Sequence, residues 1–225
     1  MKSLMYHITL SEEIKRLCPA FQGVAVMAQV TNSAHNAELW REIDAFTREL
    51  RAGETAESIK QQPAIAATRE AYKRCGKDPS RYRPSAEALR RRLMRGLALS
   101  HIDTLVDLVN LVSLRPGYSI GGFDADKIQG DSLELGFGRA EEPFEGIGRG
   151  TLNIEGLPVY RDRAGGIGTP TSDNERTKMG LETRRILAIV NGYNGREGLA
   201  EAAGMIQELL RKYADSDGGT ILYFE

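Results

Sequence analysis

A cluster of polar side chains between residues 172 and 177 is the part of the sequence best suited to chemistry. It brings hydroxyl and acceptor groups together within six residues: Ser172, Asp173, Asn174, Glu175 and Thr177. The cluster follows the glycine-rich run 165–168, where backbone without side chains allows close approach. Such a cluster suits an amine-bearing, hydroxyl-rich ligand. A turn with an Asx cap explains the same residues equally well.

A second polar group lies on the otherwise apolar segment 104–114. Asp107, Asn110 and Ser113 recur every three residues, which places them on one face of a helix. We interpret this stripe in two ways, as the wall of a ligand pocket or as hydrogen-bonding groups that tie a neighbouring loop to the helix.

Basic residues concentrate in the segment 73–95. It holds nine Lys and Arg residues against two acidic ones, so it carries +7 while the whole chain is at −1. Several cations along one surface favour contact with a phosphate backbone. Six arginines are therefore predicted to contact RNA: Arg81, Arg83, Arg90, Arg91, Arg92 and Arg95. The alternative is the solvated face of a helix.

Several function classes lack the motifs that they require. There is no phosphate loop, no paired-histidine metal motif and no nucleophile elbow. His7, His35 and His101 lie far apart without metal-ligand spacing, and Cys18 and Cys75 are too few for a disulfide framework. We expect no metal and no organic cofactor. No signal peptide or membrane span is recognisable, so we expect a cytoplasmic protein that contacts no membrane.

Capping residues and apolar periodicity predict the secondary structure. Helices are expected to begin at or near Ser11, Asn36, Pro63, Pro84 and Asp103, with a further one carrying Leu199 to Leu210. Strands are expected within residues 23–30, 133–137, 159–161, 186–190 and 221–224. The glycine stretches 121–122 and 165–168 are interpreted as loops.

Helices dominate the first half of this order and strands the second, without regular βαβ alternation. That order predicts an α+β fold with helices packed on a mostly antiparallel or mixed sheet. No linker or repeat divides the chain, so residues 1–225 are expected to form one domain.

Two stretches of the sequence are similar to a known family. The run 107–114 followed by Gly117, Phe123-Asp124, Lys127-Ile128 and Gly130 resembles an Asp-x-x-Asn helix that leads to a His-Ala-Phe-Asp loop. The run 164–168, with Thr177 and Leu181-Glu182 beyond it, resembles a glycine-rich loop and the stretch after it. Both belong to the B3/B4 editing domain of the phenylalanyl-tRNA synthetase β subunit. The resemblance spans roughly residues 80–192.

In the synthetase this domain hydrolyses mischarged tyrosyl-tRNA, so the resemblance implies an aminoacyl-ester pocket and the acceptor end of a tRNA as the partner. It assigns substrate binding to Asp107, Asn110, Gly121, Gly122, Asp124, Gly166 and Asp173. Glu175 and Thr177 are the expected catalytic residues, for positioning water or the substrate and for binding the oxyanion. If the resemblance holds, the stretches 121–124 and 165–169 should approach each other.

The chain also departs from the family pattern. Gly121 stands where the family has its histidine, and Thr169-Pro170 where it has a glutamate. Three hypotheses therefore remain: an editing domain acting in trans, a non-catalytic module that binds RNA or an amino acid, and an enzyme that uses the pocket for another small molecule.

Overall fold

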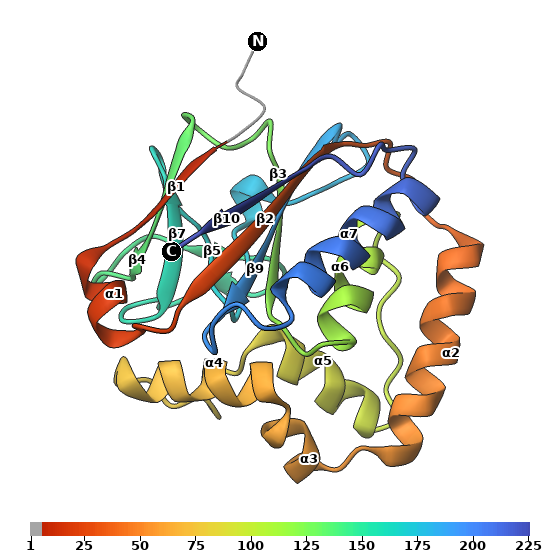
Figure 1. Ribbon diagram of the computed structural model, residues 1–225, viewed down its shortest axis with the longest axis horizontal. Coiled ribbons are helices and arrows are strands. Elements are labelled where there is room, and N and C mark those ends of the chain that lie inside the picture. The colour runs from red at the N-terminus through yellow and green to blue at the C-terminus, as the bar shows by residue number, and fades with distance from the viewer. Residues whose placement is uncertain (1–5) are drawn as a thin grey trace.

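The computed structural model describes residues 6–225 and shows two four-stranded sheets with helices around them (Figure 1). The first sheet is antiparallel throughout and has the order β10 (Thr220–Phe224), β2 (Gln22–Gln29), β9 (Arg185–Gly192), β3 (Ile120–Asp124). The second is mixed, with the order β1 (His7–Leu10), β4 (Ser132–Phe137), β7 (Pro158–Asp162), β8 (Gly165–Gly168). A hairpin of β5 (Glu145–Gly146) and β6 (Gly150–Thr151) completes the strands of the described chain.

Seven α-helices form the rest of the described regular structure, apart from the short 3-10 helix η1 (Glu175–Thr177). They are α1 (Glu12–Leu17), α2 (Ala37–Gly53), α3 (Ala56–Gln61), α4 (Pro63–Arg74), α5 (Ser85–Met94), α6 (Thr104–Leu114) and α7 (Leu199–Tyr213). Asn36 and Asp103 cap α2 and α6 by accepting hydrogen bonds from backbone N–H groups of the first turn. The fold is α+β, as the sequence predicted. No helix of residues 6–225 is long and apolar enough to cross a bilayer.

Strands β2, β3 and β9 of the first sheet are buried on both faces, which explains why β2 and β9 are continuous apolar runs, whereas the edge strand β10 is partly exposed. Val24 and Val26 of β2 belong to the core shared with α6 and α7, whereas the alternating Ala25 and Met27 face the core shared with the second sheet. The layers are therefore helices, first sheet and second sheet. In Figure 1, α6 and α7 lie on one side of β2 and β9, and β1, β4 and β7 lie on the other.

The two glycine stretches form strands and not the loops that we expected. Gly121 and Gly122 lie within β3, and residues 165–168 are β8. Among these glycines only Gly165 has positive φ, at 134°. A Cβ on Gly168 would lie 2.6 Å from both Asp173 Oδ1 and Phe123 Cζ. Gly121, Gly122, Gly166 and Gly168 therefore permit close packing, whereas Gly165, at the end of the β7–β8 turn, has a backbone conformation that favours glycine.

Candidate functional site

The segment 173–178 connects the edges of the two sheets. Asp173 pairs with Gly168 at the edge of the second sheet, and Lys178 pairs with Phe123 at the edge of the first. Between them, Asn174 pairs with Gly146 of the β5–β6 hairpin. The stretches 121–124 and 165–169 consequently lie together, as the resemblance predicted.

The ring of Phe123 and the carboxyl of Asp173 fill the space between these two strands. A Cβ on Gly121 would lie 2.7 Å from Phe123 Cζ and 3.4 Å from Asp173 Oδ1. Gly168 faces the same two side chains from β8. Gly121 and Phe123 share a face of β3 because side chains alternate along a strand. We call these four residues the glycine-lined site.

Asp173 carries the unusual electrostatics of the glycine-lined site. Its Oδ2 accepts a hydrogen bond of 3.1 Å from the backbone N–H of Gly122. Although the residue keeps some solvent-exposed surface, burial of its carboxyl raises the pKa to about 7, and the Gly122 hydrogen bond opposes this only in part. A carboxyl that titrates near neutral pH suits general acid–base chemistry.

Glu175 fastens the β5–β6 hairpin to η1. Its Oε1 accepts a hydrogen bond of 3.1 Å from the backbone N–H of Gly148, and its Oε2 lies 2.5 Å from Lys178 Nζ. The hydrogen bonds from Lys178 and Gly148 lower the pKa of this carboxyl. Glu175 therefore stays ionised at neutral pH and is a weak base.

Thr177 is completely buried, and its hydroxyl has no hydrogen-bond partner among residues 6–225. Buried hydroxyls nearly always have one, so this group needs an explanation. The adjacent Arg176 binds both carboxylate oxygens of Asp162, at 2.9 and 2.8 Å, and so fixes η1 against the β7–β8 turn.

Two further predicted substrate residues have structural partners in this region. Asp124 Oδ2 accepts from Thr183 Oγ1 at 2.9 Å and its Oδ1 from the Asp126 N–H at 3.0 Å, which secures the turn after β3. Gly166 packs against Phe144, whose Cδ2 would lie 3.0 Å from an added Cβ.

The polar residues Asp107 and Asn110 on α6 have different surroundings. Asp107 is buried, and its carboxylate accepts from Trp40 Nε1 at 2.6 Å and from the Ile102 N–H at 3.3 Å. Burial raises the pKa of this carboxyl, and both hydrogen bonds oppose the shift. Asp107 thus ties the preceding loop to α6, which was the structural alternative, while Asn110 is half-buried on the same helix. The structure does not bring Asp107 to the glycine-lined site.

Residues 67–210, well over half of the chain, match the B3/4 domain. The chain belongs to the B3/4 domain family. No curated protein matches the chain.

One similar solved structure is an N-terminal fragment of the phenylalanyl-tRNA synthetase β subunit from Pyrococcus horikoshii. It is 14% identical, with a TM-score of 0.48, and the match covers 98% of this chain and 52% of that fragment. The chain therefore spans about half the length of the structure that it matches.

The basic segment of this B3/4 domain is partly internal, which corrects how its arginines are interpreted. Arg90 is buried and forms an ion pair with Glu54, while its guanidinium also donates to the Leu114 and Arg115 carbonyls. Arg91 donates to the fully buried Glu87 at 2.7 Å. Arg83 lies 3.8 Å from the same carboxylate. Arg90 and Arg91 neutralise carboxylates inside the protein and are therefore not free for phosphate, whereas the side chain of Arg83 is 33% exposed.

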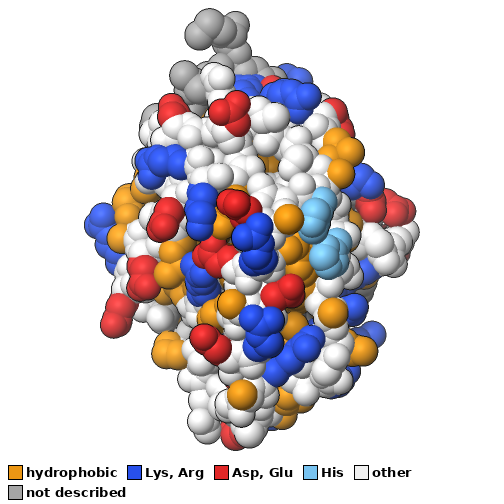
Figure 2. Space-filling view, turned by 90° about the vertical axis from the view of Figure 1, so that its right-hand side faces the viewer, with side chains coloured by type: hydrophobic (Ala, Val, Ile, Leu, Met, Phe, Trp, Pro, Cys, Tyr) orange, Lys and Arg blue, Asp and Glu red, His pale blue; other side chains and the backbone are white. Residues whose placement is uncertain are grey.

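Arg81, Arg92 and Arg95 remain exposed in the B3/4 domain. We call them the exposed arginines. The face that includes α2, on the right of Figure 1, shows basic and acidic side chains interspersed (Figure 2). That face offers no continuous positive surface to a polyanion.

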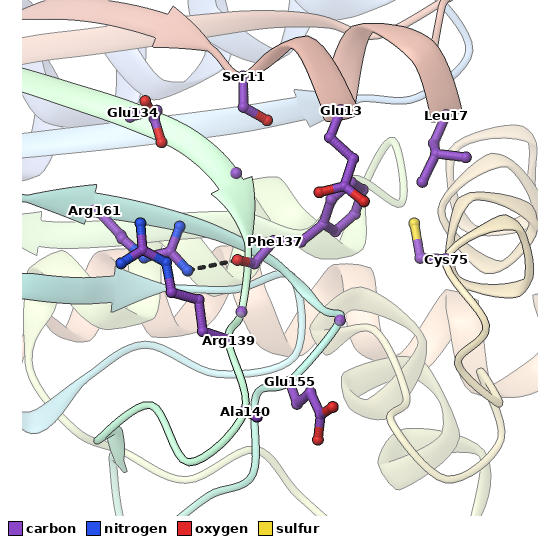
Figure 3. A pocket seen from close by; sticks show the side chains of 13 residues that line it. Ser11, Glu13, Leu17, Cys75, Glu134, Phe137, Arg139, Ala140, Glu155 and Arg161 are labelled. Atoms are coloured by element: carbon purple, nitrogen blue, oxygen red, sulfur yellow. Dashed lines mark hydrogen bonds between the residues drawn. The ribbon is translucent and has the colours of Figure 1, made fainter.

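A separate cavity does not include any residue of the glycine-lined site. It measures about 460 Å³ and is lined by residues of α1, β4 and the end of α4, including Glu13, Leu17 and Cys75 (Figure 3). Its Arg161 donates to the Phe137 carbonyl at 2.6 Å and is bound by Glu142, also at 2.6 Å. None of the predicted site residues lines this cavity.

A smaller cavity of about 250 Å³ adjoins the residues that follow β8. Thr169 and Thr171 line it together with Arg81, Tyr82 and Arg149. Of these five residues only Arg81 was a predicted site residue, and the two that add an aromatic ring and a second cation are Tyr82 and Arg149. The available signals were an aromatic residue among the basic residues of segment 73–95 and an arginine within the glycine-punctuated stretch 146–150.

No group of three or more His, Cys, Asp and Glu side chains within the described part of the chain is placed to hold a metal ion. His101 instead stacks on Trp40, with ring centroids 3.4 Å apart, and on His35, at 5.6 Å.

Proposed function

We propose that this B3/4 domain binds the acceptor end of a tRNA and hydrolyses a mischarged aminoacyl ester in trans. The observation that carries the proposal is the Asp173 carboxyl, whose pKa is raised to about 7 and which lies between the two glycine strands of the site. The family supports a module related to phenylalanyl-tRNA synthetase. The buried Asp173 carboxyl supplies this domain with a general base near neutral pH.

In this mechanism, ionised Asp173 accepts a proton from the water that attacks the ester carbonyl carbon. The tetrahedral intermediate collapses with cleavage of the bond to the ribose oxygen, which leaves with that proton as the hydroxyl. The products are the free amino acid and the uncharged tRNA. A general base of this kind typically accelerates a reaction by a factor on the order of 100 to 10,000.

Glu175 and Thr177 have supporting roles in the proposal. Glu175 positions the β5–β6 hairpin through Gly148, next to the segment that carries Asp173. The unpaired hydroxyl of Thr177 is the donor that we assign to the developing oxyanion. Because Thr177 is fully buried, this role requires η1 to shift when the substrate binds.

The exposed arginines are the contacts that we assign to the tRNA, since cations free of buried partners can displace counterions from phosphates. The proposal treats residues 1–225 as one domain, uses no metal or organic cofactor and places the protein in the cytoplasm with its substrate.

The test is single-turnover release of labelled amino acid from a panel of charged tRNAs, with protein in excess. We expect the wild-type rate to rise with pH through about 7, because only the ionised carboxyl is a base. Asp173→Asn should lower the rate about 100-fold or more and abolish this pH dependence while tRNA affinity stays unchanged. Glu175→Gln and Thr177→Val should also slow the reaction, but each should keep the pH profile.

One observation favours a second candidate, a binding module without hydrolysis. The Phe123 ring and Asp173 occupy the space beside Gly121, where the resembling family has its histidine. Measurable tRNA affinity without release of any amino acid would decide for this candidate. Hydrolysis that persists unchanged in Asp173→Asn would remove Asp173 from the mechanism.

A further inference from the structure

The 250 Å³ cavity beside the glycine-lined site has walls of a distinctive chemistry. Leu152, Ile154 and Leu157 give it an apolar side, and the half-buried ring of Tyr82 also lines it. Sites for small organic ligands combine such apolar walls with a few polar groups. The volume lies just below the usual range of such sites, so the cavity suits one base and its ribose.

The cavity is positively charged. Arg81 and Arg149 line it and both are exposed, while no acidic residue lines it; the Glu145 carboxylate lies next to it and accepts a hydrogen bond from the lining Thr151. Neither arginine takes part in an ion pair within residues 6–225. In this they differ from Arg90 and Arg91, which form ion pairs with Glu54 and Glu87. Two guanidinium groups without a carboxylate partner favour an anionic ligand.

Tyr82 is the aromatic surface of the cavity, and it is held in place. Thr171 Oγ1 donates a hydrogen bond of 2.9 Å to the Tyr82 carbonyl, and the same hydroxyl lies 2.8 Å from the Tyr72 hydroxyl. Lys77 Nζ and the Arg81 guanidinium lie over the ring, 5.0 and 5.5 Å from its centroid, so a base that stacks on Tyr82 takes the place of one of these exposed side chains. Proteins that bind single-stranded nucleic acid combine aromatic rings, on which the bases stack, with cations that contact the backbone.

We infer that this cavity binds a single unpaired nucleotide, with the base on Tyr82 and the phosphates at Arg81 and Arg149. The chemistry is that of a nucleoside monophosphate, and its source is the single-stranded 3′ end of an RNA. Every base can stack on an aromatic ring, and contacts to phosphate do not depend on the base, so we expect little base preference. The inference rests on the proposed function, because it supplies the site for the nucleotide that carries the ester.

The position of the cavity relative to Asp173 supports this occupant. Thr169 and Thr171 line the cavity, and the turn that they form is closed by hydrogen bonds between Thr169 and Ser172, directly before Asp173. The hairpin that carries Arg149 is attached to the same segment by the Ile147 N–H, which donates to the Asp173 carbonyl at 3.1 Å. The segment that carries the proposed base therefore also forms one wall of the nucleotide site.

The test compares three ligands by fluorescence competition: a tRNA minihelix with a single-stranded 3′ end, the same minihelix with a blunt end, and free AMP. We expect the single-stranded end to bind at least tenfold more tightly than the blunt one. Tyr82→Leu should lose about tenfold for the single-stranded end, whereas Tyr82→Phe keeps the ring and should bind like the wild type. The circular dichroism and melting temperature of each variant report whether it folds.

The arginines are tested by the dependence of affinity on salt. Arg81→Gln and Arg149→Gln should each reduce the slope of log K against log salt by about 0.7, the value for one contact to a single strand. The matched control is Arg48→Gln, an exposed arginine on α2 that does not line the cavity and should leave the slope unchanged.

Each of the other possible outcomes of these tests refutes one named part of the proposals. Equal affinity for both minihelix ends, or wild-type binding by a folded Tyr82→Leu protein, would refute the nucleotide site. Binding of AMP alone, with the same loss in Tyr82→Leu, would refute an RNA end as the source. If the Tyr82 and arginine variants lose RNA binding but the wild type hydrolyses no charged tRNA, the nucleotide site is supported and the proposed ester hydrolysis is refuted. Hydrolysis with KM unchanged in Tyr82→Leu and Arg149→Gln would refute the cavity alone.

Discussion

Replacing Asp173 by asparagine tests the electrostatics of the site independently of any substrate. Burial raises the pKa of this carboxyl from 3.8 to about 7 in the folded protein. Between these values the unfolded chain has lost the proton that the folded chain still holds. Stability therefore falls as pH rises, by about 1.4 kcal/mol for each pH unit, until the folded carboxyl ionises near pH 7.

The asparagine variant lacks this titration and keeps an oxygen that can accept from the Gly122 N–H. Its free energy of unfolding, relative to wild type, should therefore increase by ~3 kcal/mol between pH 5 and pH 8. Urea denaturation at one-unit pH intervals measures the difference. The control is Glu175→Gln. Because the pKa of Glu175 is lowered, its titration lies below this range, and the difference from wild type should stay flat. If the difference in free energy of unfolding between Asp173→Asn and wild type also does not change with pH, the raised pKa of Asp173 is refuted.

Two further predictions concern the arginines and the glycines. Arg92→Gln with Arg95→Gln should weaken tRNA binding and reduce its salt slope by about 1.4 to 1.8 without changing stability, because both side chains are exposed. Arg90→Gln should instead lower the melting temperature by roughly 6 to 20 °C, since it removes the cation from the Glu54 carboxylate, whose side chain is only 11% exposed; equal stability of both variants would contradict the internal role of Arg90. Gly121→His should destabilise the protein by about 1 to 3 kcal/mol in urea denaturation and should not raise hydrolysis above the wild-type rate, because the Phe123 ring lies 2.7 Å from the position of the new Cβ. A stable and more active histidine variant would show that the ring moves aside.

The sequence by itself determined the helices and strands that are signalled by residues adjacent in the chain. Asn36 and Asp103 start α2 and α6 where capping predicted, because a cap and the helix that it begins are neighbours in the chain. The apolar runs of β2 and β9 indicated buried strands for the same reason. The family resemblance also lay in local motifs, and the match over residues 67–210 confirms it.

Only the tertiary structure decided what the charged residues do. Arg90 and Arg92 are two residues apart in a basic run, yet one pairs with Glu54 in the interior while the other is exposed. Local pattern does not separate them, because the partner of Arg90 comes from another helical region, 36 residues away.

The same holds for the glycines and for Asp173. A run of glycines predicts a turn as readily as a strand, and what selects the strand here is the Phe123 ring between β3 and β8. The carboxyl of Asp173 acquires its raised pKa from burial at that junction, 51 residues along the chain from the Gly122 N–H that it binds. Desolvation depends on everything packed around a group, so it arises only when distant segments meet.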